Sequence, residues 1–211
     1  MDKTQIAVSI FNKYASEYQN KFMDVNLYSD SLDLFCKKIT KQKASVLELA
    51  CGPGNITKYL LDKRPDLKIL GTDLAPRMIK LARQNNPAAE FKILDCRNIS
   101  VFEKKFDAII CGFCFPYLNK NEALKLISDA SELLKPNGVI YISTMEDDYD
   151  NSGFKKGSSG EEIFMYYYTA DDLTGMLEKN NFKIAELQRK ESTAPDGTTV
   201  IDLIILAVKL P

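Results

Sequence analysis

Apolar stretches of strand length alternate with helical patterns along most of this 211-residue chain, and this alternation limits the possible folds more than any other feature. We predict strands over residues 46–50, 68–72, 91–94, 106–110 and 138–144, and helices over residues 55–63, 76–85 and 120–134. Strands that are joined through helices belong to crossover units, in which the strands run parallel. The chain is therefore expected to form an α/β fold around a mostly parallel sheet.

The first predicted strand leads into a loop that is suited to binding a ligand. Four apolar or small residues surround Glu48 in residues 46–50, so this strand has no polar side and is expected to be covered on both faces. It is followed by Gly52 and Gly54, which allow the backbone to turn sharply and to approach a ligand closely. Asn55 is expected to cap the next helix. A strand, a glycine turn and a helix N-terminus in succession indicate a binding site.

The segments on either side of this core have patterns of their own. Apolar residues at helical spacing predict two N-terminal helical segments, the first with Ile6, Ile10 and Tyr14 and the second with Leu32, Phe35 and Ile39. The C-terminal runs 182–190 and 199–209 are joined by a turn signal at residues 194–197, so the sheet is expected to end antiparallel. We expect one domain of four parts: an N-terminal helical cap (1–41), the core (42–144), a lid or substrate loop (145–168) and a terminal helix with a hairpin (169–211).

Local signals mark several helix ends. Pro76 suits the first turn of a helix, and Asn119 with Glu122 forms a predicted cap pair. Thr169 with Asp172 has the same spacing. The sequence at residues 135–138 predicts a turn that ends the preceding helix.

Composition disfavours several classes of partner and site. The 28 basic and 29 acidic residues nearly balance without a dense basic cluster, so nucleic acid is not expected as a partner. The first residues are charged and no run of about eighteen apolar residues occurs, so we expect a cytoplasmic protein without a membrane partner. Five cysteines are expected to be free thiols. The absence of histidine removes the commonest general base and metal ligand, and we expect no metal.

A carboxylate at the end of the second predicted strand points to a nucleoside. Asp73 is placed where it can accept hydrogen bonds from both hydroxyls of a ribose. The dinucleotide fingerprint G-x-G-x-x-G is incomplete, because Thr57 stands at the position of its third glycine. An NAD-dependent oxidoreductase therefore stays open only as the less favoured alternative.

Five stretches together resemble a known enzyme family. In order and spacing, the successive motifs of the class I S-adenosylmethionine-dependent methyltransferases are similar to residues 46–57, 71–79, 94–99, 106–118 and 133–144. The resemblance covers roughly residues 40–145 and implies a Rossmann-like, seven-stranded sheet in the order 3-2-1-4-5-7-6. It also implies that helices cover both faces and that the last strand is antiparallel.

The resemblance implies a set of residues that contact S-adenosylmethionine and its product S-adenosylhomocysteine. Those expected at the methionine part are Glu48, Ala50, Gly52 and Gly54, with Ala50 in place of the usual first glycine. Those expected at the ribose and the adenine are Asp73, Leu74, Met78, Asp95 and Cys96. Those expected to flank the sulfonium are Cys111 and Phe113, and those expected in a helix that closes over the cofactor are Tyr14 and Tyr18.

The implied activity is methyl transfer to an O, N or C nucleophile of a small molecule by in-line displacement. The methyl donor is already activated, so alignment and exclusion of water can supply much of the catalysis and the missing histidine is tolerable. We assign no catalytic residue, and we expect a monomer or homodimer. A protein that binds the cofactor without turnover is the main alternative.

Two other motifs have weaker interpretations. Cys111 and Cys114 have the C-x-x-C spacing, but they end a strand instead of opening a helix and lack a second ligand pair, which disfavours redox and zinc sites. The acidic residues 146–150 are typical of a solvated loop. As a hypothesis, they attract a cationic amine to the mouth of the site.

Overall fold

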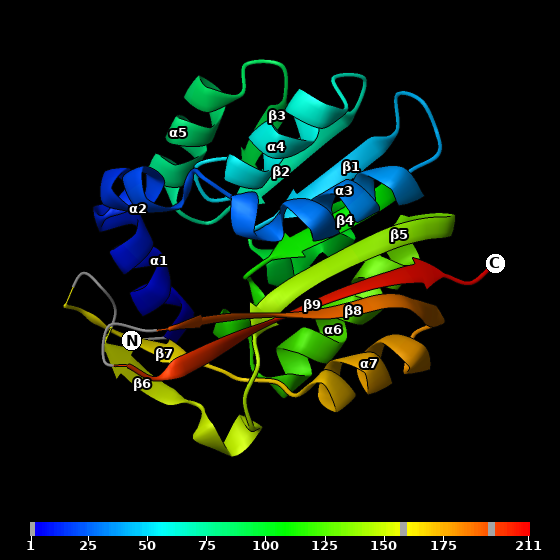
Figure 1. Ribbon diagram of the computed structural model, residues 1–211. Coiled ribbons are helices and arrows are strands. Elements are labelled where there is room, and N and C mark those ends of the chain that lie inside the picture. The colour runs from blue at the N-terminus through cyan, green and yellow to red at the C-terminus, as the bar shows by residue number, and fades with distance from the viewer. Residues whose placement is uncertain (1–2, 157–159, 194–196) are drawn as a thin grey trace.

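A seven-stranded sheet forms the centre of the computed structural model, which describes residues 3–156, 160–193 and 197–211 (Figure 1). Its order is β3-β2-β1-β4-β5-β9-β8, and its strands are β1 Ser45–Leu49, β2 Lys68–Asp73, β3 Glu90–Ile93, β4 Phe106–Gly112, β5 Leu134–Met145, β8 Phe182–Thr193 and β9 Thr199–Lys209. The first five strands pair in parallel, while β9 is antiparallel to both β5 and β8. The expected order and the reversed last strand are confirmed.

Helices cover both faces of the sheet, as the unbroken apolar runs predict. On one face, side chains such as Val46 and Ile110 pack with α3 Ser29–Lys38 and α4 Asn55–Lys63. On the other face, side chains such as Leu47 and Ile109 pack with α6 Lys120–Leu133 and α7 Ala170–Lys179. The helix α5 Pro76–Asn85 packs against β2 and β3. Both faces of the central strands are thereby removed from water.

Most of the local helix signals are confirmed. Asn119 accepts hydrogen bonds from the backbone N–H groups of residues 121 and 122, and Glu122 accepts one from the Asn119 N–H, which completes a capping box. Thr169 and Asp172 form a second capping box. The cap predicted at Asn55 is wrong. Gly54 holds that position with φ +80°, which favours glycine, and Asn55 is the first helical residue.

The predicted turn at residues 135–138 lies inside β5 and does not precede it. Asn137 has φ +60°, and the pairing of β4 with β5 shifts in register between Phe106 and Ala108. The turn residues therefore create an irregularity in a longer strand. The hairpin turn predicted at residues 194–197 lies largely outside the described residues.

The N-terminal helices lie beyond the carboxyl ends of the parallel strands (Figure 1). They are α1 Lys3–Lys13 and α2 Ala15–Phe22, and a short 3₁₀ turn, Asn26–Tyr28, leads from them to α3. The face of α1 that was predicted from Ile6, Ile10 and Tyr14 is not its buried face, because Ala7 is the buried residue of this helix. In the second segment, Leu32, Phe35 and Ile39 are buried as expected.

The segment 145–168 contains more regular structure than the predicted loop. A 3₁₀ turn, Tyr149–Asn151, is followed by β6 Gly153–Lys156 and β7 Glu162–Met165, which pair antiparallel in a separate sheet. The rings of Phe154 and Phe164 pack edge to face across this pair, with centroids 5.2 Å apart. The strand β7 contacts α1, so the segment borders the N-terminal helices. Within the ranges described, no helix combines the length and apolar character needed to cross a lipid bilayer.

Candidate functional site

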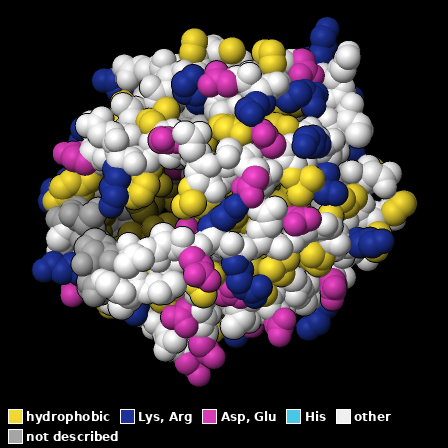
Figure 2. Space-filling model, in the orientation of Figure 1, with side chains coloured by type: hydrophobic (Ala, Val, Ile, Leu, Met, Phe, Trp, Pro, Cys, Tyr) yellow, Lys and Arg dark blue, Asp and Glu magenta, His cyan; other side chains and the backbone are white. Residues whose placement is uncertain are grey.

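A cavity of about 800 Å³, its open mouth included, lies where β1, β2 and β4 end and where α1 and α2 approach the sheet. Figure 2 shows a hollow with hydrophobic side chains on the side of the molecule where α1 and the β6–β7 pair lie. Sites of this volume commonly hold small molecules, and the carboxyl edge of an open α/β sheet is where such ligands bind.

Gly52 and Asp73 meet at one end of this cavity. The Gly52 N–H donates a hydrogen bond to Asp73 Oδ2 over 2.9 Å, and the Ala75 N–H donates to Oδ1 over 2.8 Å. Burial raises the pKa of the Asp73 carboxyl, while these N–H groups act in the opposite direction. The two donors leave Asp73 with capacity for further hydrogen bonds, since a carboxylate has about four acceptor sites.

The two glycines of the loop have different surroundings. A Cβ atom on Gly52, where φ is +52°, would have Tyr18 Cε1 as its nearest neighbour at 3.7 Å. A Cβ atom on Gly54 would lie only 2.4 Å from Asn86 Nδ2, which itself donates a hydrogen bond to the Gly54 carbonyl. A Cβ atom on Gly52 would therefore make an ordinary van der Waals contact with α2, whereas Gly54 has no room for one.

This difference predicts separate effects for two alanine variants. Gly54→Ala should lower the free energy of unfolding by about 2–4 kcal/mol, because it adds both a left-handed alanine and an overpacked contact. Gly52→Ala should lower it by only about 1–2 kcal/mol. Because Gly52 lines the cavity, Gly52→Ala should still weaken nucleoside binding about 10-fold. Urea unfolding measures the stability of the two variants, and calorimetric titration measures their affinity. The prediction is contradicted if both variants lose the same stability and the same affinity.

Glu48 is fully buried beneath this loop and does not line the cavity. The Thr57 hydroxyl donates a hydrogen bond to Glu48 Oε2, while Oε1 has no hydrogen-bond partner among the described residues. Burial raises the pKa of Glu48 to about 8, with a smaller contribution from the nearby charge of Asp73. This carboxyl can therefore hold a proton near neutral pH.

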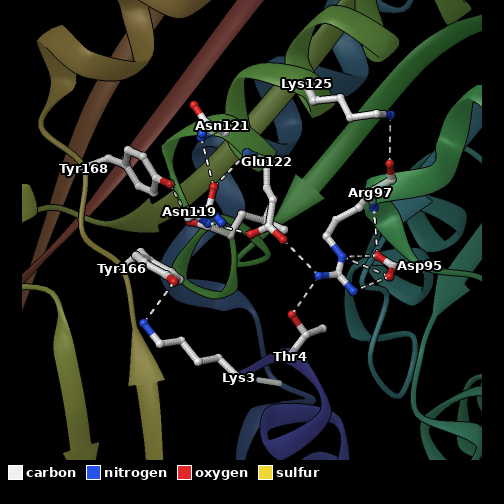
Figure 3. Close-up of polar contacts among 11 residues, drawn as sticks. Lys3, Thr4, Asp95, Arg97, Asn119, Asn121, Glu122, Lys125, Tyr166 and Tyr168 are labelled. Atoms are coloured by element: carbon white, nitrogen blue, oxygen red, sulfur yellow. Dashed lines mark hydrogen bonds and ion pairs between the residues drawn. The ribbon is translucent and has the colours of Figure 1, made fainter. Parts of the chain in front are cut away.

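A second polar group, formed by Asp95 and Arg97, lines another part of the cavity. The Arg97 guanidinium lies between Asp95, Thr4 and Glu122 (Figure 3). Its Nη2 atom is 2.7 Å from Asp95 Oδ2, and its Nη1 atom donates to Glu122 Oε1 over 2.9 Å. The arrangement joins the 3₁₀ turn Cys96–Val101, α6 and α1 around one cation.

Aromatic rings line the cavity beside the end of β4. Phe113 directly follows β4 with φ +54°, and its N–H donates to the Ser143 carbonyl over 3.0 Å. The Phe11 ring packs edge to face against Tyr18 and against Tyr117, with centroid distances of 5.7 and 5.2 Å. All four rings belong to residues that line the cavity.

The structure brings together most of the residues that the sequence predicts for the site. Those that line the cavity toward the glycine loop and the predicted sulfonium end are Tyr18, Ala50, Gly52 and Phe113. Those that line the remainder are Asp73, Leu74, Met78, Asp95 and Cys96.

Four predicted residues lie elsewhere. Glu48 and Gly54 lie behind the loop, and Cys111 is fully buried inside β4. The Tyr14 hydroxyl donates to Glu161 Oε1 over 3.2 Å, which directs this side chain toward the segment that precedes β7. These four residues do not line the cavity, so their positions give no direct contact with a ligand bound there.

Sequence reasoning missed the inner face of α1 and several residues near the strand ends. The missed residues of α1 are Thr4, Ala7, Val8 and Phe11, and the others are Leu94, Arg97, Gly112, Cys114, Tyr117 and Leu118. The spacing i, i+3, i+4, i+7 on α1 is a helix-face signal that could have found the first four.

The charges of the lining restrict the ligand. Among the described residues that line the cavity, the charged side chains are Asp73, Asp95 and Arg97, and Arg97 is paired with two carboxylates. This set suits a neutral or cationic ligand better than a polyphosphate. Within the described ranges, no three metal-ligating side chains are grouped closely enough to hold a metal ion.

Comparison with known proteins gives a consistent result. Residues 46–138 match a sequence family described as a methyltransferase domain. A malonyl-[acyl-carrier protein] O-methyltransferase of Acetivibrio thermocellus is 34% identical over 121 residues, which cover 56% of this chain and 40% of that protein. The chain spans less than half of the length of that protein, of a putative methyltransferase of Invertebrate iridescent virus 6 and of a demethylmenaquinone methyltransferase of Thermotoga maritima.

Two solved structures share the fold over almost the whole chain. One is the magnesium protoporphyrin IX methyltransferase of Synechocystis with bound S-adenosylmethionine, which has a TM-score of 0.72, 18% identity, and coverage of 99% of this chain and 98% of that one. The other is an S-adenosylmethionine-dependent methyltransferase of Clostridium acetobutylicum, with a TM-score of 0.71, 18% identity, and coverage of 96% and 100%.

Proposed function

We propose that this chain, which has the motifs and the fold of the class I S-adenosylmethionine-dependent methyltransferases, binds S-adenosylmethionine and transfers its methyl group to a small molecule. The observation that carries the proposal is the position of Gly52 and Asp73. The half-buried backbone of Gly52 and a carboxylate with remaining acceptor capacity meet at one end of a cavity that is otherwise mostly apolar.

The residues of the cavity fit the parts of this cofactor. Asp73 accepts hydrogen bonds from the ribose hydroxyls, and the backbone at Ala50 and Gly52 approaches the methionine part. Leu74 and Met78 provide an apolar surface for the adenine, and Met78 is almost fully buried. The absence of unpaired basic side chains from the described lining suits the sulfonium and ammonium groups.

The chain's contribution to the reaction is placement. When bound, the cofactor supplies a methyl group on a sulfonium that leaves as a neutral thioether. The inner face of α1 and the rings of Phe11, Tyr18 and Tyr117 line the cavity and give it an apolar wall. Alignment of the acceptor with the methyl carbon can supply up to about 7–11 kcal/mol of the barrier reduction.

The acceptor is proposed only as a small molecule with an O, N or C nucleophile. The methyltransferases named above are described as acting on a malonyl carrier protein and on magnesium protoporphyrin IX, which have little chemistry in common. Two residues of the acidic segment 146–150 have partners of their own. Glu146 Oε2 is paired with Arg189 Nε at 2.6 Å, and Asp148 caps the 3₁₀ turn that follows it. These two carboxylates therefore give no support to a cationic acceptor.

Two alternatives make different predictions. An NAD-dependent oxidoreductase would need donors for a pyrophosphate, and Arg97, the basic side chain in the described lining, is already paired. A protein that binds the cofactor without turnover is compatible with the lack of histidine. This second alternative differs from an enzyme only in turnover.

Calorimetric titration with S-adenosylmethionine, S-adenosylhomocysteine and NAD tests the proposal. We expect saturable binding of both sulfur nucleosides and none of NAD. A screen of small-molecule acceptors that monitors formation of S-adenosylhomocysteine then tests turnover. Binding of NAD alone would overturn the proposal, and cofactor binding without turnover across phenol, amine, carboxylate and carbon-acid acceptors would favour the non-catalytic alternative.

A further inference from the structure

We propose that Asp95 is a positioning residue that acts through Arg97, and that Arg97 holds α1 over the cofactor. This inference rests on the proposed function, because it assigns roles within the same site. It differs from the expectation that Asp95 itself recognises the adenine edge.

The hydrogen-bond capacity of Asp95 is the first observation. Oδ1 accepts from the Arg97 backbone N–H over 2.9 Å and from Arg97 Nε over 3.0 Å. Oδ2 accepts from Nε over 3.0 Å and from Nη2 over 2.7 Å. The Nε–H is shared between the two oxygens, so Arg97 gives three N–H hydrogens to the roughly four acceptor sites of this carboxylate. An adenine amino group would therefore compete with a charge-assisted fork that already occupies most of Asp95.

The other contacts of Arg97 show what this fork positions. Nη1 donates to Thr4 Oγ1 over 3.0 Å and to Glu122 Oε1 over 2.9 Å. The other oxygen of Glu122 accepts from the Asn119 N–H in the capping box of α6, and Lys125 on the same helix donates to the Arg97 carbonyl over 3.0 Å. Arg97 is thus fixed by α6 on one side and binds α1 on the other (Figure 3).

The other contacts of α1 show where this link acts. The inner face of α1, which includes Thr4, Ala7 and Phe11, lines the cavity. Phe11 also packs against a small buried cluster that includes Met78, and Asn12, near the other end of the helix, accepts a hydrogen bond from the Arg77 N–H. The hydrogen bond between Arg97 and Thr4 adds a polar contact at the N-terminal end of the helix. Thr4 and Arg97 both line the cavity, so the contact between them lies at the site itself.

The test is a double-variant cycle that is read with two ligands. Dissociation constants for S-adenosylhomocysteine and S-inosylhomocysteine, which has a carbonyl in place of the adenine amino group, are measured for wild type, Asp95→Asn, Arg97→Met and the double variant. We expect each single variant to weaken S-adenosylhomocysteine binding about 10-fold. The double variant should bind no more weakly than Arg97→Met, and the preference between the two ligands should be the same in Asp95→Asn as in wild type.

A direct base contact gives the opposite results. If Asp95 accepts from the adenine amino group, Asp95→Asn should shift the preference toward S-inosylhomocysteine, since an amide can donate to the carbonyl, and the two losses should add. Either result overturns the inference, as does unchanged affinity in Arg97→Met. Failure of wild type to bind S-adenosylhomocysteine would instead defeat the proposed function, and this inference with it.

Two further variants separate positioning from general stability. Arg64→Met removes a similar fork on Asp66, with contacts of 2.7 and 2.9 Å, at a place outside the cavity lining. It should lower the unfolding temperature without changing ligand affinity. Thr4→Val removes the hydroxyl contact with Arg97, and stopped-flow measurement should show faster dissociation of S-adenosylhomocysteine. An unchanged dissociation rate in Thr4→Val would overturn the role of Arg97 in holding α1.

Discussion

Asp73→Asn is expected to weaken binding of S-adenosylmethionine and S-adenosylhomocysteine about 100-fold or more, while the protein stays folded. Hydrogen bonds to a charged acceptor contribute about 1.5–3 kcal/mol each, and loss of two such bonds to a ribose is sufficient for this effect. The Asn side chain keeps one oxygen that can accept from the Gly52 or the Ala75 N–H. Its NH₂ group cannot replace the second acceptor, so we also expect a lower unfolding temperature.

Asp66→Asn is the matched control for this variant. Asp66 also accepts a backbone hydrogen bond, from the Lys43 N–H over 2.8 Å, and it lies outside the cavity lining. Loss of its pairing with Arg64 should reduce stability and leave nucleoside affinity unchanged. Titration calorimetry and thermal unfolding of both variants measure the two effects separately. Wild-type affinity in Asp73→Asn would remove Asp73 from the ligand site.

The parts of the fold that the sequence predicts well depend on local or pairwise signals. The capping box at Asn119 and Glu122 needs only two side chains three positions apart, and the structure confirms it. The strand order follows from the resemblance of successive motifs, and it is also confirmed. The cap predicted at Asn55 failed because the left-handed backbone at Gly54 moved the helix start by one residue.

The missed features depend on contacts between distant segments. The inner face of α1 combines Thr4 and Ala7 with Phe11, which gives only a weak apolar stripe because the face borders a cavity. Arg97 is two positions from Asp95 along the chain, but its partners Thr4 and Glu122 are 93 and 25 positions away. No spacing rule connects these residues, so tertiary structure was needed to identify the group.

Glu48→Gln should become more stable than wild type as the pH rises. Because the pKa of Glu48 in the folded protein is about 8 and its ordinary value is 4.5, the folded state binds the proton more tightly than the unfolded state. Wild type must therefore lose stability as the pH rises from about 4.5 to about 8, with no further loss above that range. Glutamine carries no charge, and the Thr57 hydroxyl can still donate to its oxygen. The two proteins should be similar at pH 5, and the variant more stable by a few kcal/mol at pH 9.

Urea unfolding of both proteins from pH 5 to pH 9 measures this difference directly. Titration of other groups cancels in the comparison, and the absence of histidine leaves few other groups that titrate in this range. Glu178→Gln, on the exposed surface of α7, is the control and should follow the wild-type curve. If Glu48→Gln also follows that curve, the folded protein must stabilise the charged form of Glu48, although Oε1 has no hydrogen-bond partner among the described residues. If the predicted divergence is found, Glu48 is a protonated carboxylic acid at neutral pH that accepts a hydrogen bond from the Thr57 hydroxyl in α4.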